Sequence, residues 1–175
     1  MHEKTISAKV VFKGRLLTVE VLDVELENGV RTVREVVRHS GAVGVLAQLP
    51  DSSFVLVRQF RKPLECELIE IVAGGMEPGE LPEDCAVRET REETGYETAS
   101  VEKLGVVALA PGYSSEQLHL FYAKLAQAGD VCPDPDEYVQ VVRLMEAEID
   151  GMIGRNEIKD AKTVAAWYLW KARLK

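Results

Sequence analysis

Cysteine is scarce in this chain of 175 residues. The three that occur, Cys66, Cys85 and Cys132, are an odd number, are widely spaced and form no Cys-x-x-Cys pair. This pattern argues against a disulfide framework and a structural zinc site, and it favours free thiols in a reducing compartment. Apolar runs near the roughly 20 residues that span a bilayer are also absent, as is the apolar core of a signal peptide. We therefore expect a cytoplasmic protein without a membrane partner.

Runs of basic residues are missing as well. The chain carries 29 acidic and 21 basic side chains, a net charge of -8, and its isoelectric point is about 5.0. This balance argues against nucleic acid as a partner. The length, the 46% apolar content and the absence of repeats and linkers predict one globular domain, with at most a small extension. An acidic protein can still bind a phosphorylated substrate when a divalent cation mediates.

A β-hairpin is predicted in the first part of the chain. Residues 16–26 and 30–37 both alternate between apolar and polar side chains, which is typical of half-buried strands. Asn28 and Gly29 lie between them, and both tolerate the positive φ angles that a tight hairpin turn requires.

The order of the remaining elements predicts the fold class. Strands are expected at residues 42–49, 54–60, 68–72, 101–109, 118–125 and 138–144, and helices at 83–94, 146–154 and 160–174. Pro82 suits a first helical position and Gly95 a position after the last turn. Strands, a helix, strands and then two helices indicate an α/β or α+β sandwich, in which helices flank a mixed sheet.

The helix at 83–94 concentrates acidic side chains. Glu89, Glu92 and Glu93 are spaced i, i+3 and i+4, so they share one face of the helix. Such a face is often only a solvated acidic surface, and Arg88 is placed to relieve its repulsion by pairing with Glu92. Three residues on the opposite side are predicted to pack on the sheet: Val87, Thr90 and Thr94.

A glycine-rich turn with its own acid, Glu80, precedes this helix. From Gly74 to Tyr96 the chain resembles the Nudix box, G-x5-E-x7-R-E-U-x-E-E-x-G-U, at every fixed position. Thr90 departs from the bulky apolar residue expected at one U position, which affects local packing rather than chemistry. The resemblance implies a Nudix-type α/β/α sandwich with a mixed sheet, and an enzyme that hydrolyses a nucleoside diphosphate linked to another group.

The resemblance also implies a metal site for Mg²⁺ or Mn²⁺, hard cations that prefer oxygen ligands. Its metal ligands would be Glu89 and Glu93, with Glu92 close by, together with the backbone carbonyl of Ala73. Arg88 would orient the carboxylates, and Glu80 would either bind the metal or hold the loop. The catalytic set implied in this way is Arg88, Glu92, Glu93 and, from an acidic loop further on, Glu137.

Segments outside the box resemble the ADP-ribose (ADP-sugar) pyrophosphatase branch of the family. They are residues 57–61, 70–74, 110–116, 136–141 and 158–163, and two of them depart from the pattern, with Ala110 in place of Ser and Val72 in place of Pro. The branch implies that ADP-ribose is split into AMP and ribose 5-phosphate. The alternatives are the same chemistry on ADP-glucose or GDP-mannose, and a catalytically silent nucleotide-binding regulator.

The same branch implies the residues that contact the nucleotide sugar. They are Arg61 for the phosphates, Glu70, the loop residues Pro111, Gly112, Tyr113 and Glu116, and Arg34 and Arg38 across a subunit interface. Either Glu116 or Glu137 would act as the base, and Pro135, where some relatives carry an acid, leaves this choice open.

The hairpin region exceeds what a minimal Nudix core requires. In similar ADP-sugar pyrophosphatases this region is a β subdomain exchanged between two subunits, each helping to build the adenine pocket of the other. The resemblance therefore implies a homodimer, an N-terminal antiparallel β subdomain at residues 1–40, swapped in the dimer, and a Nudix hydrolase domain at 41–175.

Overall fold

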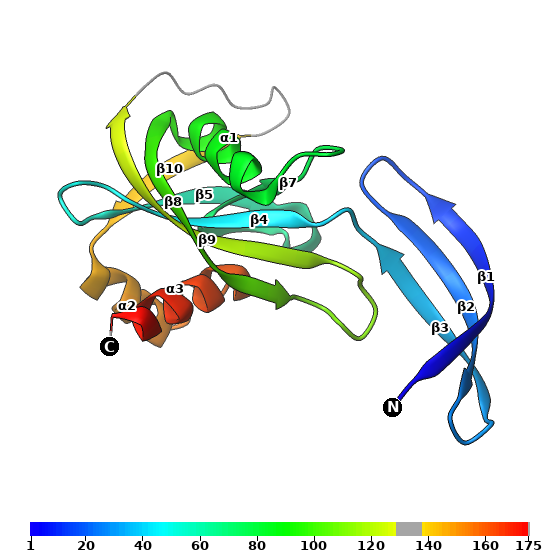
Figure 1. Cartoon of the computed structure of the whole chain (residues 1–175). Helices are drawn as coiled ribbons and strands as arrows, with labels where there is room; N and C mark the ends of the chain where they lie inside the picture. The colour runs from blue at the N-terminus through cyan, green and yellow to red at the C-terminus, as the bar shows by residue number, and fades with distance from the viewer. Residues whose placement is uncertain (129–137, 175) are drawn as a thin grey trace. The chain divides into compact units, whose positions relative to one another are not determined.

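The chain folds into two compact units (Figure 1). The computed structural model describes residues 1–128 and 138–174. The first unit contains Met1–Gly41 and Ala108–Gln117, and the second contains Ala42–Val107 and Leu118–Lys175. Among the described residues no helix is long and apolar enough to cross a membrane.

The first unit is built on a three-stranded antiparallel sheet of β1 (Glu3–Lys13), β2 (Thr18–Leu26) and β3 (Arg31–Arg38), in that order. The predicted hairpin between β2 and β3 is confirmed. Gly29 has a φ of 81°, and the Asn28 side-chain oxygen accepts the N–H of Val30 at 3.1 Å.

Strand β1 was not among the predicted strands. Its pairing with β2 shifts register twice, between Thr5 and Ser7 and between Val10 and Phe12. Each bulge inserts a residue and breaks the period of two on which recognition of a strand depends. The strand is therefore real but has no clean alternation.

The segment Ala108–Gln117 belongs to the first unit although it lies some seventy residues further along the chain. Backbone hydrogen bonds attach it to the end of β3: the Val37 N–H donates to the Tyr113 carbonyl at 2.7 Å, and the Ser115 N–H donates to the Val37 carbonyl at 2.9 Å. The Ser115 hydroxyl also accepts the N–H of His39 at 3.1 Å.

The second unit is built on a mixed sheet, as predicted, and this sheet has seven strands. They are β4 (Ala42–Gln48), β5 (Phe54–Arg61), β6 (Cys66–Glu70), β7 (Val72–Gly75), β8 (Tyr96–Ala108), β9 (Gln117–Ala128) and β10 (Val139–Leu144), with a 3-10 turn at Lys62–Leu64. The main order is β10-β5-β4-β9-β8, while β6 pairs with β5 and β7 with β4. Strands β4 and β9 are parallel, and β4 pairs antiparallel with β5 and β7.

Helices cover both faces of this sheet, which confirms the predicted sandwich (Figure 1). On one face α1 (Pro82–Thr94) packs through Cys85 and Ala86 against alternate strand residues such as Val43 and Val55. On the other face the intervening strand residues pack against α2 (Glu146–Gly154) and α3 (Ala161–Arg173). There the Phe54 ring meets Trp167 edge-on at 5.0 Å, so the apolar runs of β4 and β5 are buried on both sides.

The single strand predicted at 68–72 is two strands. Glu70 on β6 pairs with β5, whereas Val72 on β7 pairs with β4, so the chain crosses from one neighbour to the other at Ile71. The Ile71 N–H leaves the ladder and donates to the Thr163 hydroxyl at 2.9 Å. A partner 92 residues away causes this break, and the local sequence pattern does not reveal it.

Helix α1 begins at Pro82 and ends before Gly95, which has a φ of 70°, as predicted. The prediction that Val87 packs on the sheet is wrong, because its side chain is 39% exposed. Ala86 is buried in its place, since 86, 90 and 94 form one i, i+4 row of the helix. The unexpected Thr90 is buried and donates its hydroxyl proton to the Ala86 carbonyl at 2.7 Å, which satisfies its polar group.

Candidate active site

The second unit brings the acidic helix α1 against the strand that precedes it. Strand β7 is paired with the central strand β4, so its backbone is fixed, and Glu89 of α1 packs directly on Gly74. A Cβ atom added at Gly74 would lie 1.9 Å from the carboxyl carbon of Glu89. Only a glycine at this position leaves room for the carboxylate, which explains why the motif begins with one.

Arg88 lies among the carboxylates that sequence reasoning grouped together. Its Nε and Nη2 donate to the two oxygens of Glu80 at 2.8 and 2.9 Å, and the Glu77 N–H also donates to Glu80. The Arg88 hydrogen bonds, followed by that N–H, lower the pKa of Glu80 to about 2. Both Glu80 oxygens are engaged in holding the turn before α1, so its contacts fit the loop-holding alternative.

The remaining nitrogen of Arg88 bridges two carboxylates of the helix. Nη1 donates to Glu89 at 2.7 Å and to Glu92 at 2.9 Å, and Nη2 also donates to the Gly75 carbonyl at 3.1 Å. The hydrogen bond with Glu80, followed by those with Glu89 and Glu92, raises the pKa of the guanidinium. One cation therefore orients the helix carboxylates and ties them to strand β7.

Glu93 connects the helix to the strand on its buried side. Its side chain is only 5% exposed, and Oε2 accepts the N–H of Ala73 at 3.4 Å. The Ala73 peptide and the carboxylates of Glu89 and Glu93 thus meet along one edge between β7 and α1.

The chemistry of this donor set fits a hard divalent cation. Carboxylate oxygens and a backbone carbonyl are the ligands that Mg²⁺ prefers, and Gly74 leaves the space that Glu89 occupies. Among residues 1–128 and 138–174, no three His, Cys, Asp or Glu side chains are already arranged to hold a metal ion. The physical reason is Arg88, which draws Glu89 and Glu92 to itself and supplies the positive charge between them.

Arg61 and Glu70 form a second charged pair in this unit. Arg61 donates from Nε and Nη2 to the two oxygens of Glu70 at 2.8 and 2.6 Å. The hydrogen bond with Glu70 is the main cause that raises the pKa of Arg61, and the charges of Asp160 and Glu93 add to it. The negative charge of Glu93, which lies on the acidic helix, therefore also favours the charged form of Arg61.

Lys162 lies in the segment 158–163 that resembles the ADP-sugar branch, but sequence reasoning gave it no role, and its ammonium also contacts Glu70. Its neighbour Asp160 caps α3 by accepting the N–H of Thr163 at 2.9 Å. The available signal was the Asp-x-x-Thr spacing before an apolar run, which is typical of a helix start. That signal locates the helix but does not predict the contact with Glu70.

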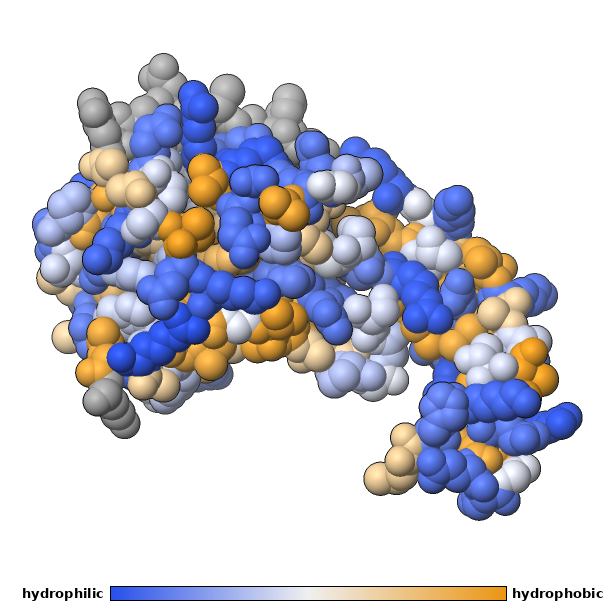
Figure 2. Space-filling model, viewed as in Figure 1, coloured by the Kyte–Doolittle hydropathy of each residue, from blue (hydrophilic) through white to orange (hydrophobic). Residues whose placement is uncertain are grey.

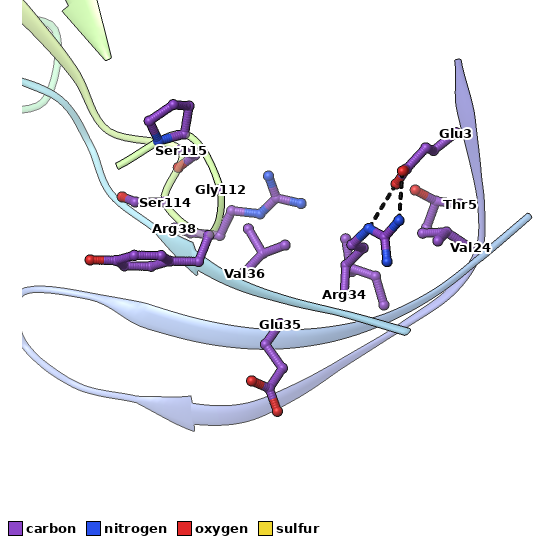
Figure 3. Close-up of a pocket in the computed structure, with 13 residues that line it drawn as sticks. Glu3, Thr5, Val24, Arg34, Glu35, Val36, Arg38, Gly112, Ser114 and Ser115 are labelled. Carbon is purple, nitrogen blue, oxygen red and sulfur yellow. Dashed lines mark hydrogen bonds and ion pairs between the residues drawn. The ribbon is translucent and has the colours of Figure 1, made fainter. Parts of the chain in front are cut away.

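The first unit contains a cavity of about 430 Å³ that collects five predicted substrate residues (Figure 3). They are Arg34, Arg38, Pro111, Gly112 and Tyr113. Arg34 is held by Glu3 through hydrogen bonds of 3.0 and 2.7 Å, and Arg38 by Glu20 at 2.8 Å. The attachment of the loop to β3 explains why residues so distant in sequence line one cavity.

The two candidates for the base differ in what the structure describes. Glu116 is partly buried, and its N–H donates to the Ser114 hydroxyl at 3.1 Å, next to but outside the residues that line the cavity. Glu137 lies outside the described residues.

Comparison with known proteins agrees with this geometry. A model described as NUDIX domain matches residues 38–167. The chain belongs to the Nudix family. It is a Nudix hydrolase, and the box residues are those gathered around Arg88.

Several Nudix relatives are similar over nearly their whole length. An ADP-ribose pyrophosphatase of Bacillus subtilis (strain 168) is 39% identical over 95% of this chain and 91% of that protein. A methanol dehydrogenase activator of Bacillus methanolicus is 44% identical over 94% of this chain and 90% of that protein. The crystal structure of an ADP compounds hydrolase, 26% identical, superposes with a TM-score of 0.87 over 99% of this chain and 95% of that one.

The contact between Gly74 and Glu89 generates a test with a matched control. We expect Gly74→Ala to displace the Glu89 carboxylate, and a shift of about 1 Å in a catalytic constellation costs on the order of 10²-fold in rate. Gly75→Ala adds the same methyl group where nothing lies within 4 Å, so it should keep its activity. Rates of nucleoside diphosphate sugar hydrolysis at saturating Mg²⁺ measure both. Equal rates for the two variants would show that the close packing of Glu89 is not required.

Proposed function

We propose that this protein hydrolyses the pyrophosphate of ADP-ribose to AMP and ribose 5-phosphate, with Mg²⁺ as its cofactor. The observation that carries the proposal is the Arg88-centred carboxylate cluster packed on Gly74, in a chain 39% identical to an ADP-ribose pyrophosphatase. The second unit has an acidic edge, formed by Ala73, Glu89 and Glu93, that suits a metal-bound pyrophosphate. The first unit, taken by itself, has an arginine-lined cavity that suits a nucleoside.

In this proposal Glu89, Glu93 and the carbonyl of Ala73 hold the cation, with Glu92 close by. When bound, Mg²⁺ neutralises the pyrophosphate and lowers the pKa of the attacking water. Arg88 keeps the carboxylates turned toward one another through its bonds to Glu89 and Glu92. This arrangement reduces the reorganisation needed when substrate arrives.

Arg61 binds the phosphates in the same proposal. Glu70 holds its Nε and Nη2, which leaves Nη1 as the nitrogen directed to the substrate. Because Glu70 is only 1% exposed and bonded through both oxygens, we assign it to holding Arg61 rather than to contacting the sugar.

The cavity of the first unit is proposed to bind the adenosine end of the substrate. Tyr113 is an exposed aromatic ring at its border, suited to stack on a base, and Pro111 and Gly112 shape the turn that presents it. Arg34 and Arg38 supply positive charge at the same cavity, each positioned by a carboxylate of the sheet.

A panel of nucleotide sugars tests the substrate. We expect ADP-ribose to be among the best substrates by kcat/KM, ahead of ADP-glucose and GDP-mannose, with activity lost in EDTA and restored by Mg²⁺. Glu93→Gln serves as the inactive control because it removes a proposed metal ligand. A clear preference for GDP-mannose would overturn the assignment to ADP-ribose. It would support the alternative of the same chemistry on another nucleotide sugar.

The base is tested by comparing Glu137→Gln with Glu116→Gln. We propose that Glu137 orients the attacking water, and loss of a general base lowers kcat by about 10²–10⁴-fold with little change in KM. Glu116 should affect substrate binding instead and raise KM. A large loss of kcat only in Glu116→Gln would reverse the two roles, and unchanged kcat in both would show that no separate base exists.

We further propose a homodimer that exchanges the first unit. All eleven residues of β1 are exposed, including the apolar Val10, Val11 and Phe12, each more than half exposed. Figure 2 shows apolar atoms at the surface of this unit. Exposed apolar area of this kind is typical of an interface. Sedimentation equilibrium should give twice the 19.4 kDa chain mass, whereas a monomer at micromolar concentration would contradict the proposal.

A regulatory role is the second candidate, favoured by the methanol dehydrogenase activator that is 44% identical. The intact set of Arg88, Glu89, Glu92 and Glu93 speaks for catalysis. Binding of ADP-ribose without turnover in either Mg²⁺ or Mn²⁺ would favour the regulatory role.

A further inference from the structure

The second unit holds a buried charge network between strand β6 and the start of α3. We propose that Lys162 is a positioning residue of the active site, which neutralises Glu70 so that Glu70 fixes Arg61 without cancelling its positive charge. The inference rests on the proposed function, in which Arg61 binds the phosphates of the substrate.

Glu70 is the centre of this network and is almost completely removed from solvent. Its carboxylate accepts two hydrogen bonds from Arg61, and the Lys162 ammonium contacts the oxygen that also accepts Nη2 of Arg61. A carboxylate buried to this degree requires a compensating charge, since an unpaired one is costly. Arg61 alone would meet that requirement for Glu70, and Lys162 adds a second cation that Glu70 shares with Asp160.

The position of Lys162 in its helix is unfavourable for a cation. It lies in the first turn of α3, where the helix dipole disfavours a cation. Its side chain is only 10% exposed, so water does not offset that cost. The ammonium is held there by Glu70 and by Asp160, whose Oδ1 lies 3.1 Å away.

The charges of the network explain what the second cation does. Asp160 is largely committed to α3, because its other oxygen accepts the N–H and the hydroxyl of Thr163 at 2.9 and 2.6 Å. Asp160 still carries its negative charge, so the network contains two carboxylates and two cations, and Lys162 is the cation that makes it neutral. Without Lys162, Arg61 would be the single cation beside two carboxylates, and the network would be negative overall. Such a net negative charge would weaken the attraction of Arg61 for a diphosphate.

The network is also mechanically connected to the acidic edge. Thr163 accepts the N–H of Ile71 at 2.9 Å, and Ile71 directly precedes strand β7, which carries Ala73 and Gly74. Residues at the start of α3 therefore contact Glu70, which is the partner of Arg61. They also bond to Ile71, where the chain crosses to β7. A purely structural tether would explain the second effect but not the need for a buried positive charge.

Kinetics of four variants, compared with the wild type, separate these two roles. The variants are Lys162→Met, Lys162→Arg, the double variant Glu70→Gln/Lys162→Met, and Lys171→Met as the matched control. Lys171 lies on the same helix and pairs with Glu146 and Asp150 instead of Glu70. For each we would measure kcat and KM for ADP-ribose, the dissociation constant of ADP by calorimetry, and the melting temperature.

We expect Lys162→Met to raise KM and the dissociation constant about tenfold with kcat nearly unchanged, as for loss of one charge-assisted contact in uniform binding. Lys162→Arg should restore most of the affinity. The double variant should bind more tightly than Lys162→Met, because the neutral amide that replaces the Glu70 carboxylate would still accept from Arg61 without carrying charge. Lys171→Met should change only the melting temperature.

Unchanged KM and dissociation constant in Lys162→Met would overturn the inference and leave Lys162 a structural residue. A double variant no better than the single one would also overturn it, because charge neutralisation predicts recovery. If Lys162→Met does not fold, the double variant alone tests the inference. Near wild-type affinity of the double variant would support the inference, and a tenfold loss of affinity would contradict it. If the proposed function is wrong, the wild type will not hydrolyse ADP-ribose. The dissociation constants of ADP would still test the network in that case.

Discussion

Carboxylates crowded on one helix face repel one another, and the Arg88 guanidinium is the counter-charge on which the acidic edge depends. It bonds to Glu80 in the turn, to Glu89 and Glu92 on the helix, and to the Gly75 carbonyl on the strand. Each of these bonds is modest, but together they tie three pieces of chain to one planar group. The turn, the helix and strand β7 consequently keep a fixed geometry, and Gly74 has to be a glycine because Glu89 is held against it.

The crossing at Ile71 carries this geometry into the rest of the sheet. The chain pairs with β5 up to Glu70 and with β4 from Val72 onward. Glu70 therefore lies against the start of α3, whereas Ala73 lies beside α1. Ile71 itself is fully buried, and a Cβ at Gly44 would lie 2.9 Å from its side chain. Tight packing at the crossing therefore links Glu70, the partner of Arg61, to strand β7 within the second unit.

Much of this architecture could be predicted from local sequence. Helical spacing grouped Glu89, Glu92 and Glu93, and the Asn28-Gly29 pair located the hairpin. Alternation located β2 and β3, and apolar runs located β4 and β5. Three features could not be predicted, because each depends on partners distant in sequence or on irregular backbone. Strand β1 is bulged, the break at Ile71 depends on Thr163, and Lys162 meets Glu70 across 92 residues. Val87 was misassigned because the buried face of α1 is not opposite the carboxylates: it includes Glu93 and Cys85 as well as Ala86, Thr90 and Thr94.

Arg88 and Arg61, two arginines of the second unit, form similar ion pairs in different surroundings. Arg88 is one cation among Glu80, Glu89 and Glu92, with Glu93 nearby, so its surroundings remain negative and suit a divalent cation. Arg61 is bonded to one carboxylate, Glu70, which it shares with Lys162, so it has fewer carboxylate partners than Arg88. A metal-bound diphosphate presents both charges, positive at the metal and negative at the free oxygens. In the proposed function, the number of carboxylates around each arginine would therefore separate the metal end of the substrate from its phosphate oxygens.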